Sequence, residues 1–287
     1  MKYISFLIYK ILNIIDLIFK SIFKRSFMSH IKDLQHKNSY KKLEILKQTV
    51  NFFAPNKVVE WRIDTFYSKE PETLDWINSF ENNEKTIFWD IGANIGLYSI
   101  YNAIKNNKST TYAFEPSTSN LRVLSRNISI NNLEQKIKIF TNPLTDKSNE
   151  FRLMQENDFY EGGALNTFGE NFNFEGKKKN FKMKYSLMGV SINHILNNQI
   201  LSVPTHIKID VDGIEHLILE GANKFLKDEK LKTISVEINE NFKDQHDKIF
   251  KIMKNNNFRL LHKKHNNQMF PKGSIYENTF NFIFVRN

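Results

Sequence analysis

An apolar run that ends in an acid and leads directly into a glycine turn constrains the fold of this chain most. The run covers residues 86–91 with Asp90 near its end, and Gly92, Asn94 and Gly96 follow. A buried parallel strand reads as a continuous apolar run, and glycines let the backbone turn tightly and approach a ligand closely. The segment predicts the first strand and the ligand-binding loop of an open α/β fold.

A second apolar run, at 110–115, ends in Glu115. In dinucleotide-binding folds an acid at this place binds the ribose hydroxyls. The loop lacks the GxGxxG spacing of a pyrophosphate site, and no Lys-Ser/Thr pair marks a P-loop. A ligand with a ribose, no phosphate and a positive charge fits better, which indicates S-adenosylmethionine. We expect Asp90 and the 92–96 turn to face its methionine part, Glu115 its ribose and, by position alone, Asn142 its adenine.

Strands and helices alternate through most of the chain, which predicts a parallel sheet with helices on both faces. We expect strands at 86–91, 110–115, 136–141, 206–211 and 232–238, two closing strands at 258–263 and 279–285, and helices at 71–80, 95–106, 118–131, 214–226 and 244–256. Three regions follow: an amphipathic helix at 1–27, a helical connector and cofactor-covering segment at 28–85 with helix expected over 40–53, and the main domain at 86–287. Its insertion at 143–200 alternates like antiparallel strands and is a natural place for an acceptor pocket or lid.

Several sequence blocks together resemble the FkbM family of S-adenosylmethionine-dependent methyltransferases. The blocks are WRIDT at 61–65, EPETLDWI at 70–77, DIGANIGLYS at 90–99, AFEP at 113–116, LSRNI at 124–128, NNL at 131–133, KIDVDGIE at 208–215 and LEGA at 219–222. The resemblance implies a class I methyltransferase (Rossmann-like) fold with a mostly parallel seven-stranded sheet and an antiparallel last strand. The family pattern usually has Glu where Asp212 stands and often has Asp where Asn193 stands, so no catalytic role is carried onto Asn193.

Methyl transfer to a hydroxyl gains from a base that removes the hydroxyl proton. Asp210 is the best-placed candidate, with Asp212, Glu215 and Glu237 nearby in the expected sheet order and His216 as a weaker candidate. Two readings of these acids stay open. Asp210, Asp212 and Glu237 would bind a divalent cation such as Mg²⁺ that polarises a sugar diol, or one acid is the base while others hold Lys208.

The implied activity is O-methylation of a sugar hydroxyl in a surface polysaccharide, such as a capsule, or in a glycolipid precursor. The formal net charge of +10 also suits anionic partners such as nucleic acid. However, the Asn/Asp-Pro-Pro-Tyr/Phe motif of amino-methylating enzymes is absent after the fourth strand, so we expect no nucleic acid partner. A non-catalytic S-adenosylmethionine-binding protein is the third reading. The chain has no cysteine, which excludes disulfides and suits the cytoplasm.

Residues 1–24 predict an amphipathic helix with a wide apolar face. Lys10 and Asp16 interrupt the apolar run that a spanning helix needs. A helix lying peripherally at the inner face of a membrane fits this pattern, with lysines drawn to anionic lipid. The alternative is a helix that docks on its own domain or on a partner subunit in a homodimer.

Overall fold

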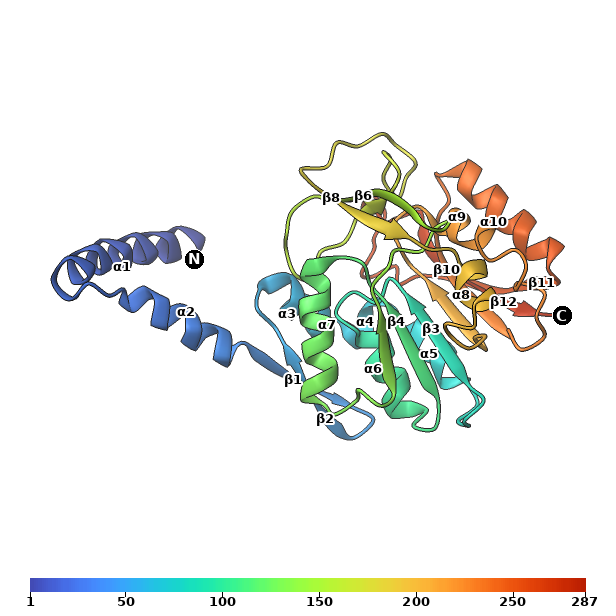
Figure 1. Ribbon diagram of the computed structural model, residues 1–287, viewed down its shortest axis with the longest axis horizontal. Coiled ribbons are helices and arrows are strands. Elements are labelled where there is room, and N and C mark those ends of the chain that lie inside the picture. Colours follow the sequence, from blue (N-terminus) through green and yellow to red (C-terminus); the bar gives the residue numbers. More distant parts are fainter.

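Seven strands form one sheet in the order β11-β12-β10-β9-β3-β4-β5 (Figure 1), and the computed structural model describes all residues, 1–287. The strands β3, β4, β5, β9 and β10 run parallel, whereas β12 is antiparallel to both neighbours, which confirms the expected fold class and its antiparallel last strand. Their bounds are β3 Ile87–Ile91, β4 Thr110–Phe114, β5 Ile137–Phe140, β9 His206–Ile209, β10 Thr233–Asn239, β11 Phe258–Lys264 and β12 Thr279–Arg286.

The two faces of this sheet carry separate apolar cores because successive side chains of a strand point to opposite sides. In β3, Phe88 joins one core and Trp89 the other. The core of Phe88 is covered by α3 Lys57–Asp64, α4 Phe66–Lys69, α5 Pro71–Asn78, α6 Leu97–Lys105 and α7 Thr118–Ile130. The core of Trp89 is covered by α8 Ile192–Asn197, α9 Glu215–Glu220 and α10 Lys243–Asn255. Helices on both faces were expected, although α8 was not.

The segment expected to be helical at 40–53 is a β-hairpin, so that prediction was wrong. Strands β1 Tyr40–Ile45 and β2 Gln48–Phe53 pair antiparallel. The turn residues Leu46 and Lys47 have φ angles of 50° and 66°, a left-handed backbone that closes a two-residue hairpin turn. Asn127 of α7 accepts a hydrogen bond from the Phe53 N–H at 2.8 Å. The hairpin thus depends on a helix distant in sequence.

The insertion at 143–200 contains a second, three-stranded antiparallel sheet, in line with its alternating pattern. Its strands are β6 Glu150–Glu156, β7 Thr167–Phe168 and β8 Met183–Gly189. Helix α9 is shorter than the expected 214–226 and ends before Gly221. A Cβ atom at Gly221 would lie 2.3 Å from the Thr145 carbonyl oxygen, so this glycine allows the insertion to approach the helix end closely.

The first two helices, α1 Lys2–Phe23 and α2 Phe27–Asn38, form an arm that projects from the domain (Figure 1). No residue of α1 is buried. Asp16 of α1 accepts hydrogen bonds from the Ser26 hydroxyl at 2.7 Å and the Phe27 N–H at 2.8 Å, so it caps α2 and fixes the turn between the helices. No helix combines the length and apolar character needed to cross a bilayer.

Candidate active site

A cavity lies where the carboxyl ends of β3, β4 and β9 meet. The chain continues from β3 to β4 on one side and reaches β9 only later on the other, so this edge is a topological switch point, where ligands bind in open α/β sheets. This first cavity holds about 610 Å³ of space between atoms, part of it open to solvent. Of the residues predicted to bind the cofactor, Gly92, Asn94, Glu115 and Asn142 line it, whereas Asp90 and Gly96 do not.

The glycine turn after β3 is shaped by close backbone contact. Gly92 has a φ of 87°, and a Cβ there would lie 1.9 Å from the Asp210 carbonyl oxygen. Gly96 has a φ of 88°, and a Cβ there would lie 2.5 Å from the Leu124 side chain. Any larger residue would therefore push the turn away from β9 or α7, so both positions need glycine.

Glu115 connects this turn to the end of β4. One carboxylate oxygen accepts from the Asn94 N–H at 2.8 Å and the other from the Ser117 N–H at 2.8 Å. Burial raises the pKa of Glu115 to about 8. The Asn94 side-chain oxygen is buried without any hydrogen-bond partner. The cavity thus presents free acceptor capacity, which fits a ligand with hydroxyls and a positive charge.

The structure gives Asp90 a different place from the one predicted. Its side chain does not line the first cavity. It accepts from the Ser99 hydroxyl at 2.6 Å and so supports the first turn of α6. Asn142 does line the cavity, and its side-chain amide donates to the Met188 carbonyl at 3.0 Å, which ties it to the insertion.

A second cavity, also of about 610 Å³, adjoins the first. The two share Gly92, Asn94, Ala164, Asp210 and Asp212 as a common wall. Glu237, a predicted site residue, also lines it, and the remaining lining residues come from outside the predicted site: Trp61, Arg62, Lys69, Phe270 and Tyr276. A group bound in one cavity can therefore meet a group bound in the other at the two aspartates.

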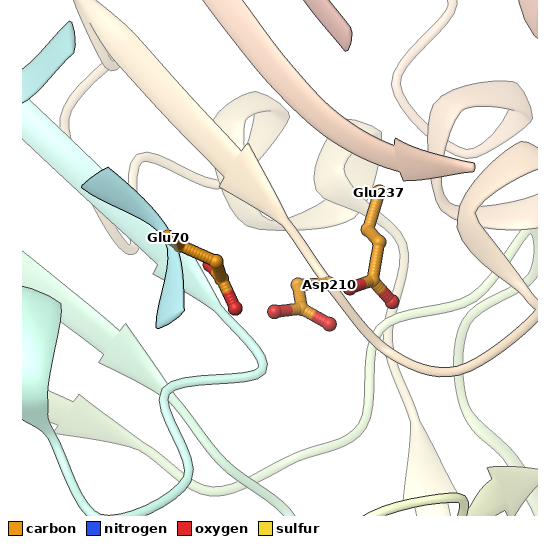
Figure 2. A group of neighbouring side chains, drawn as sticks. All are labelled: Glu70, Asp210 and Glu237. Carbon is orange, nitrogen blue, oxygen red and sulfur yellow. The ribbon is translucent and has the colours of Figure 1, made fainter. Parts of the chain in front are cut away.

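Three carboxylates converge beside this wall, from Glu70, Asp210 and Glu237, with oxygens within 4.8 Å of one another (Figure 2). Of the predicted cation set, Asp210 and Glu237 belong to this group, whereas Asp212 does not and Glu70 stands beside them instead. Lys208 pairs with Asp210 at 2.6 Å, as one of the open readings held, and Lys69 pairs with Glu70.

These lysines set the charges of the cluster. Burial alone would raise the pKa of Asp210, but Lys208 and Lys69 outweigh it and hold that pKa below its usual value. Burial and the neighbouring Asp210 raise the pKa of Glu237 well above its usual value. Two of the carboxylates are thus paired with lysines, and the equilibrium of the third is shifted toward its protonated form.

Asp212 differs from Asp210 in both backbone and charge. Its φ is 64°, a strained conformation for a non-glycine residue and one that recurs at functional sites. One carboxylate oxygen accepts from the Leu165 N–H at 2.6 Å. Burial and the Asp210 charge raise the pKa of Asp212 to about 6.

The sequence profile of the methyltransferase FkbM domain matches residues 90–260, which is more than half of the chain. This chain belongs to the FkbM methyltransferase family. It is therefore a methyltransferase that depends on S-adenosylmethionine. The comparison with curated proteins gives no match.

Solved methyltransferases of similar fold share little sequence with this FkbM methyltransferase. An FkbM methyltransferase from Methylobacillus flagellatus is 16% identical with a TM-score of 0.43; the match covers 79% of our chain and 52% of that chain. A precorrin-6y C5,15-methyltransferase from Geobacter metallireducens is 13% identical with a TM-score of 0.44, over 76% and 87% of the two chains. TrmK of M. capricolum, in complex with S-adenosyl-homocysteine, is 13% identical with a TM-score of 0.42, over 75% and 67%.

Three predicted catalytic residues of the FkbM methyltransferase line neither cavity: Lys208, Glu215 and His216. Glu215 is buried, and it accepts from the Val211 N–H at 3.1 Å and from the Gln245 side chain at 2.7 Å, so it holds the loop that carries Asp212. The His216 ring lies 6.0 Å from the Phe242 ring. Burial lowers the pKa of His216 to about 4, so it is neutral. Their positions favour structural roles.

Sequence reasoning missed the residues that line the second cavity outside the common wall, apart from Glu237. Trp61 and Arg62 belong to a block that resembles the family, but the block carries no spacing that indicates chemistry. Phe270 and Tyr276 lie in the connection between β11 and β12. The segment with Trp61 and Arg62 and the segment with Phe270 and Tyr276 are about two hundred residues apart in sequence, so only folding brings both to the aspartates.

Proposed function

We propose that this methyltransferase methylates a sugar hydroxyl held in the second cavity, while S-adenosylmethionine occupies the first. The observation that carries the proposal is the common wall, which places Asp210 and Asp212 in both cavities. Bound S-adenosylmethionine would supply a methyl group on a positively charged sulfur: the acceptor oxygen would bond to the methyl carbon, and the sulfur would leave as a neutral thioether. Holding both partners against one wall supplies the proximity that such an in-line displacement needs.

The first cavity offers a partner for each part of the methyl donor. Glu115 accepts the ribose hydroxyls, since each carboxylate oxygen has a second lone pair beyond its bond to the backbone. The unpartnered Asn94 oxygen faces the cationic end. Asn142 and the apolar side chains of Phe114 and Leu144 enclose the adenine.

Asp212 is the general base in this proposal, in preference to Asp210. A base works best when its pKa lies near the operating pH, and the pKa of Asp212 is about 6. Asp210 is bound to Lys208, which lowers its affinity for a proton. Asp210 instead positions Lys208 and keeps the pKa of Asp212 raised through its negative charge.

The charges of the carboxylate cluster favour a reaction without a divalent cation. Mg²⁺ would have to displace Lys69 from Glu70 and Lys208 from Asp210. It would also have to compete with protons for Glu237, because burial and Asp210 raise the pKa of that carboxyl well above its usual value. We therefore expect that a chelator leaves turnover unchanged and that added magnesium does not increase it.

The second cavity supports a sugar as the acceptor. It combines the aromatic side chains of Trp61, Phe270 and Tyr276 with carboxylates and basic groups, which suits a polar ligand that has apolar faces. Nucleic acid fits less well, because residues 1–38 hold seven Lys and Arg against two Asp, which is half of the net charge of +10. The catalytic domain alone is thus only moderately basic.

The arm supports a location at a membrane surface, where precursors of polysaccharides and glycolipids are assembled. Its apolar face is exposed, and Lys2, Lys10 and Lys20 lie along its polar side.

Mass spectrometry of the surface polysaccharide and glycolipids, from cells with and without the gene, tests the function. We expect one sugar to lose the mass of one methyl group, and the intact gene to restore it. A gene that carries Asp212→Asn should fail to restore it. Unchanged glycans together with a lost RNA or DNA methylation would contradict the sugar proposal.

A further inference from the structure

The second cavity contains an arginine whose terminal nitrogens have no partner. Arg62 lies on α3, whose first turn is capped by the Asn56 side chain. Its Nε donates to the Gly162 carbonyl at 2.7 Å, which holds the guanidinium in place. Its two terminal nitrogens make no hydrogen bond or ion pair within the protein. A guanidinium fixed in this way presents the pair of parallel donors that matches an oxyanion.

Other donors without acceptors surround the same space. The Tyr276 hydroxyl and the Trp61 indole N–H have no hydrogen-bond partner, and Trp61 is 42% exposed. Lys69 uses only one of its three donors, on Glu70. Burial and nearby acids raise the pKa of Tyr276 to about 12, so its hydroxyl keeps its proton and can donate.

The acids of the cavity leave Arg62 free for a ligand. Glu70 and Asp210 are paired with Lys69 and Lys208. Asp212 accepts from the Leu165 backbone and makes no ion pair with Arg62.

We propose that the second cavity selects an anionic sugar, and that Arg62 binds its oxyanion through both terminal nitrogens. The inference rests on the proposed sugar acceptor and names its class as a sugar that carries a carboxylate or a phosphate. Arg62 and Lys69 come from segments before the main sheet, whereas Asp210 and Asp212 follow β9. The oxyanion therefore binds on the side of α3 and α4, and the hydroxyl to be methylated faces Asp212.

Calorimetry on the full chain, with S-adenosylhomocysteine present and at fixed ionic strength, tests this. The probes are glucuronate, its uncharged analogue glucuronamide, and glucose 1-phosphate. We expect at least one charged probe to bind ten- to a hundredfold more tightly than glucuronamide, as charge-assisted hydrogen bonds imply. The charged probe that binds more tightly shows whether the oxyanion that Arg62 binds is a carboxylate or a phosphate.

Variants of Arg62 assign the effect to this residue. Arg62→Gln should abolish the preference for charged probes, and Arg62→Lys should restore only part of it, because an ammonium lacks the fork. Arg259→Gln is the matched control, since Arg259 is an exposed arginine of β11 outside the cavity. It should bind all probes as the unmodified chain does.

Two results would overturn the inference. Equal affinity for glucuronate, glucose 1-phosphate and glucuronamide in the unmodified chain would refute the anionic class but leave the sugar proposal standing. Binding of S-adenosylhomocysteine with no binding of any of the three probes would refute both. The comparison of probes needs no variant, so it holds even if Arg62→Gln fails to fold.

Discussion

At the residue scale, Glu115 has two roles. Its carboxylate oxygens accept backbone hydrogen bonds that hold the glycine turn, and their remaining lone pairs can accept from a ligand. We expect Glu115→Ala to weaken S-adenosylmethionine binding at least tenfold, since it removes two hydrogen bonds to the ribose of about 0.5–1.5 kcal/mol each and also releases the glycine turn. Calorimetry on the folded variant measures this. Glu134→Gln, which removes an exposed carboxylate that has no partner, is the control. An unchanged affinity would contradict the ribose assignment.

Asp212 and Asp210 should respond differently to the same substitution. We expect Asp212→Asn to bind the methyl donor normally and to lose ~10²–10⁴ in turnover, the usual loss of a general base. In the unmodified enzyme the rate should rise with pH through about 6, as Asp212 loses its proton. Asp210→Asn should move this rise to lower pH, because the Asp210 charge raises the pKa of Asp212.

Pre-steady-state rates from pH 4.5 to 8.5 check both expectations. Thermal unfolding must accompany them, since removing one partner of a buried ion pair costs about 3–5 kcal/mol, and Asp210→Asn leaves Lys208 buried. A normal rate for Asp212→Asn, with a large loss for Asp210→Asn, would show that Asp210 is the general base.

The places of the proposed cofactor-side residues follow from the sequence more directly than those of the proposed catalytic residues. Gly92 and Glu115 follow strands directly, so their place at the sheet edge is set by the strand pattern. Asp90 and Glu215 are acids of the same motifs, yet their carboxylates turn to Ser99 and to backbone N–H groups. The direction of a side chain depends on its neighbours in space, which no spacing along the chain reveals.

At the element scale, the hairpin β1–β2 shows how tertiary contacts override a local pattern. Its β2 edge is paired with Asn127 of α7 and with Asn131, the residue that follows this helix, in place of another strand. Asn127 also donates to the Ile95 carbonyl at 2.9 Å, so it links the hairpin to the glycine turn. Asn127 and Asn131, which belong to the family-like blocks at 124–128 and 131–133, thus have a structural role that only the folded chain reveals.

The helix α1 is the element whose apolar surface lacks a partner. The helix has exposed Ile, Leu and Phe side chains along its length, including Ile4, Ile11 and Ile18. We expect the full chain to sediment with vesicles rich in phosphatidylglycerol, and a truncated chain starting at Met28 to remain in solution. The truncated chain should stay folded and active on a soluble acceptor, because α1 buries no residue.

A charge variant separates electrostatic attraction to anionic lipid from nonspecific hydrophobic adsorption. Replacing Lys2, Lys10 and Lys20 by Gln removes about 1 kcal/mol of attraction to an anionic surface per residue, and should weaken vesicle binding roughly a hundredfold. If truncation instead unfolds the protein or converts a dimer to a monomer, measured by light scattering, α1 is a packing element and the membrane proposal fails.

For the whole molecule, the order of strands and the position of the first cavity could be predicted, but the second cavity could not. Parallel strands joined by helices leave little choice of topology, and the carboxyl ends then form one edge. The second cavity needs α3, α4 and the β11–β12 connection to meet at that edge. Those contacts arise from packing of the two apolar cores and leave no periodic signal in the sequence.

The stability of the whole molecule should depend on the buried acids. Burial raises the pKa of Glu215 to about 7 from a model-peptide value near 4.5. Folding favours the protonated form of Glu215. The contribution of this group to the free energy of unfolding is therefore fully present below about pH 4.5 and is lost as pH rises through about 7. From pH 5 to pH 8 this amounts to about 2–3 kcal/mol.

Urea unfolding at both pH values measures that loss. Glu215→Gln should be less stable overall, since it weakens the loop around Asp212, but its stability should fall less between pH 5 and pH 8. Glu134→Gln should keep the slope of the unmodified chain. A parallel slope for Glu215→Gln would show that Glu215 is already ionised in the folded protein.

The capped junction between α1 and α2 also determines how far the enzyme works from a surface. The twelve residues of α2 extend over about 18 Å at 1.5 Å per residue. If α1 lies flat on a bilayer, α2 becomes a spacer that keeps the catalytic domain within about 2 nm of the headgroups. Acceptors carried on lipids would then meet the enzyme by diffusion in two dimensions at a high effective concentration. Weak binding of each single sugar would suffice for such an enzyme.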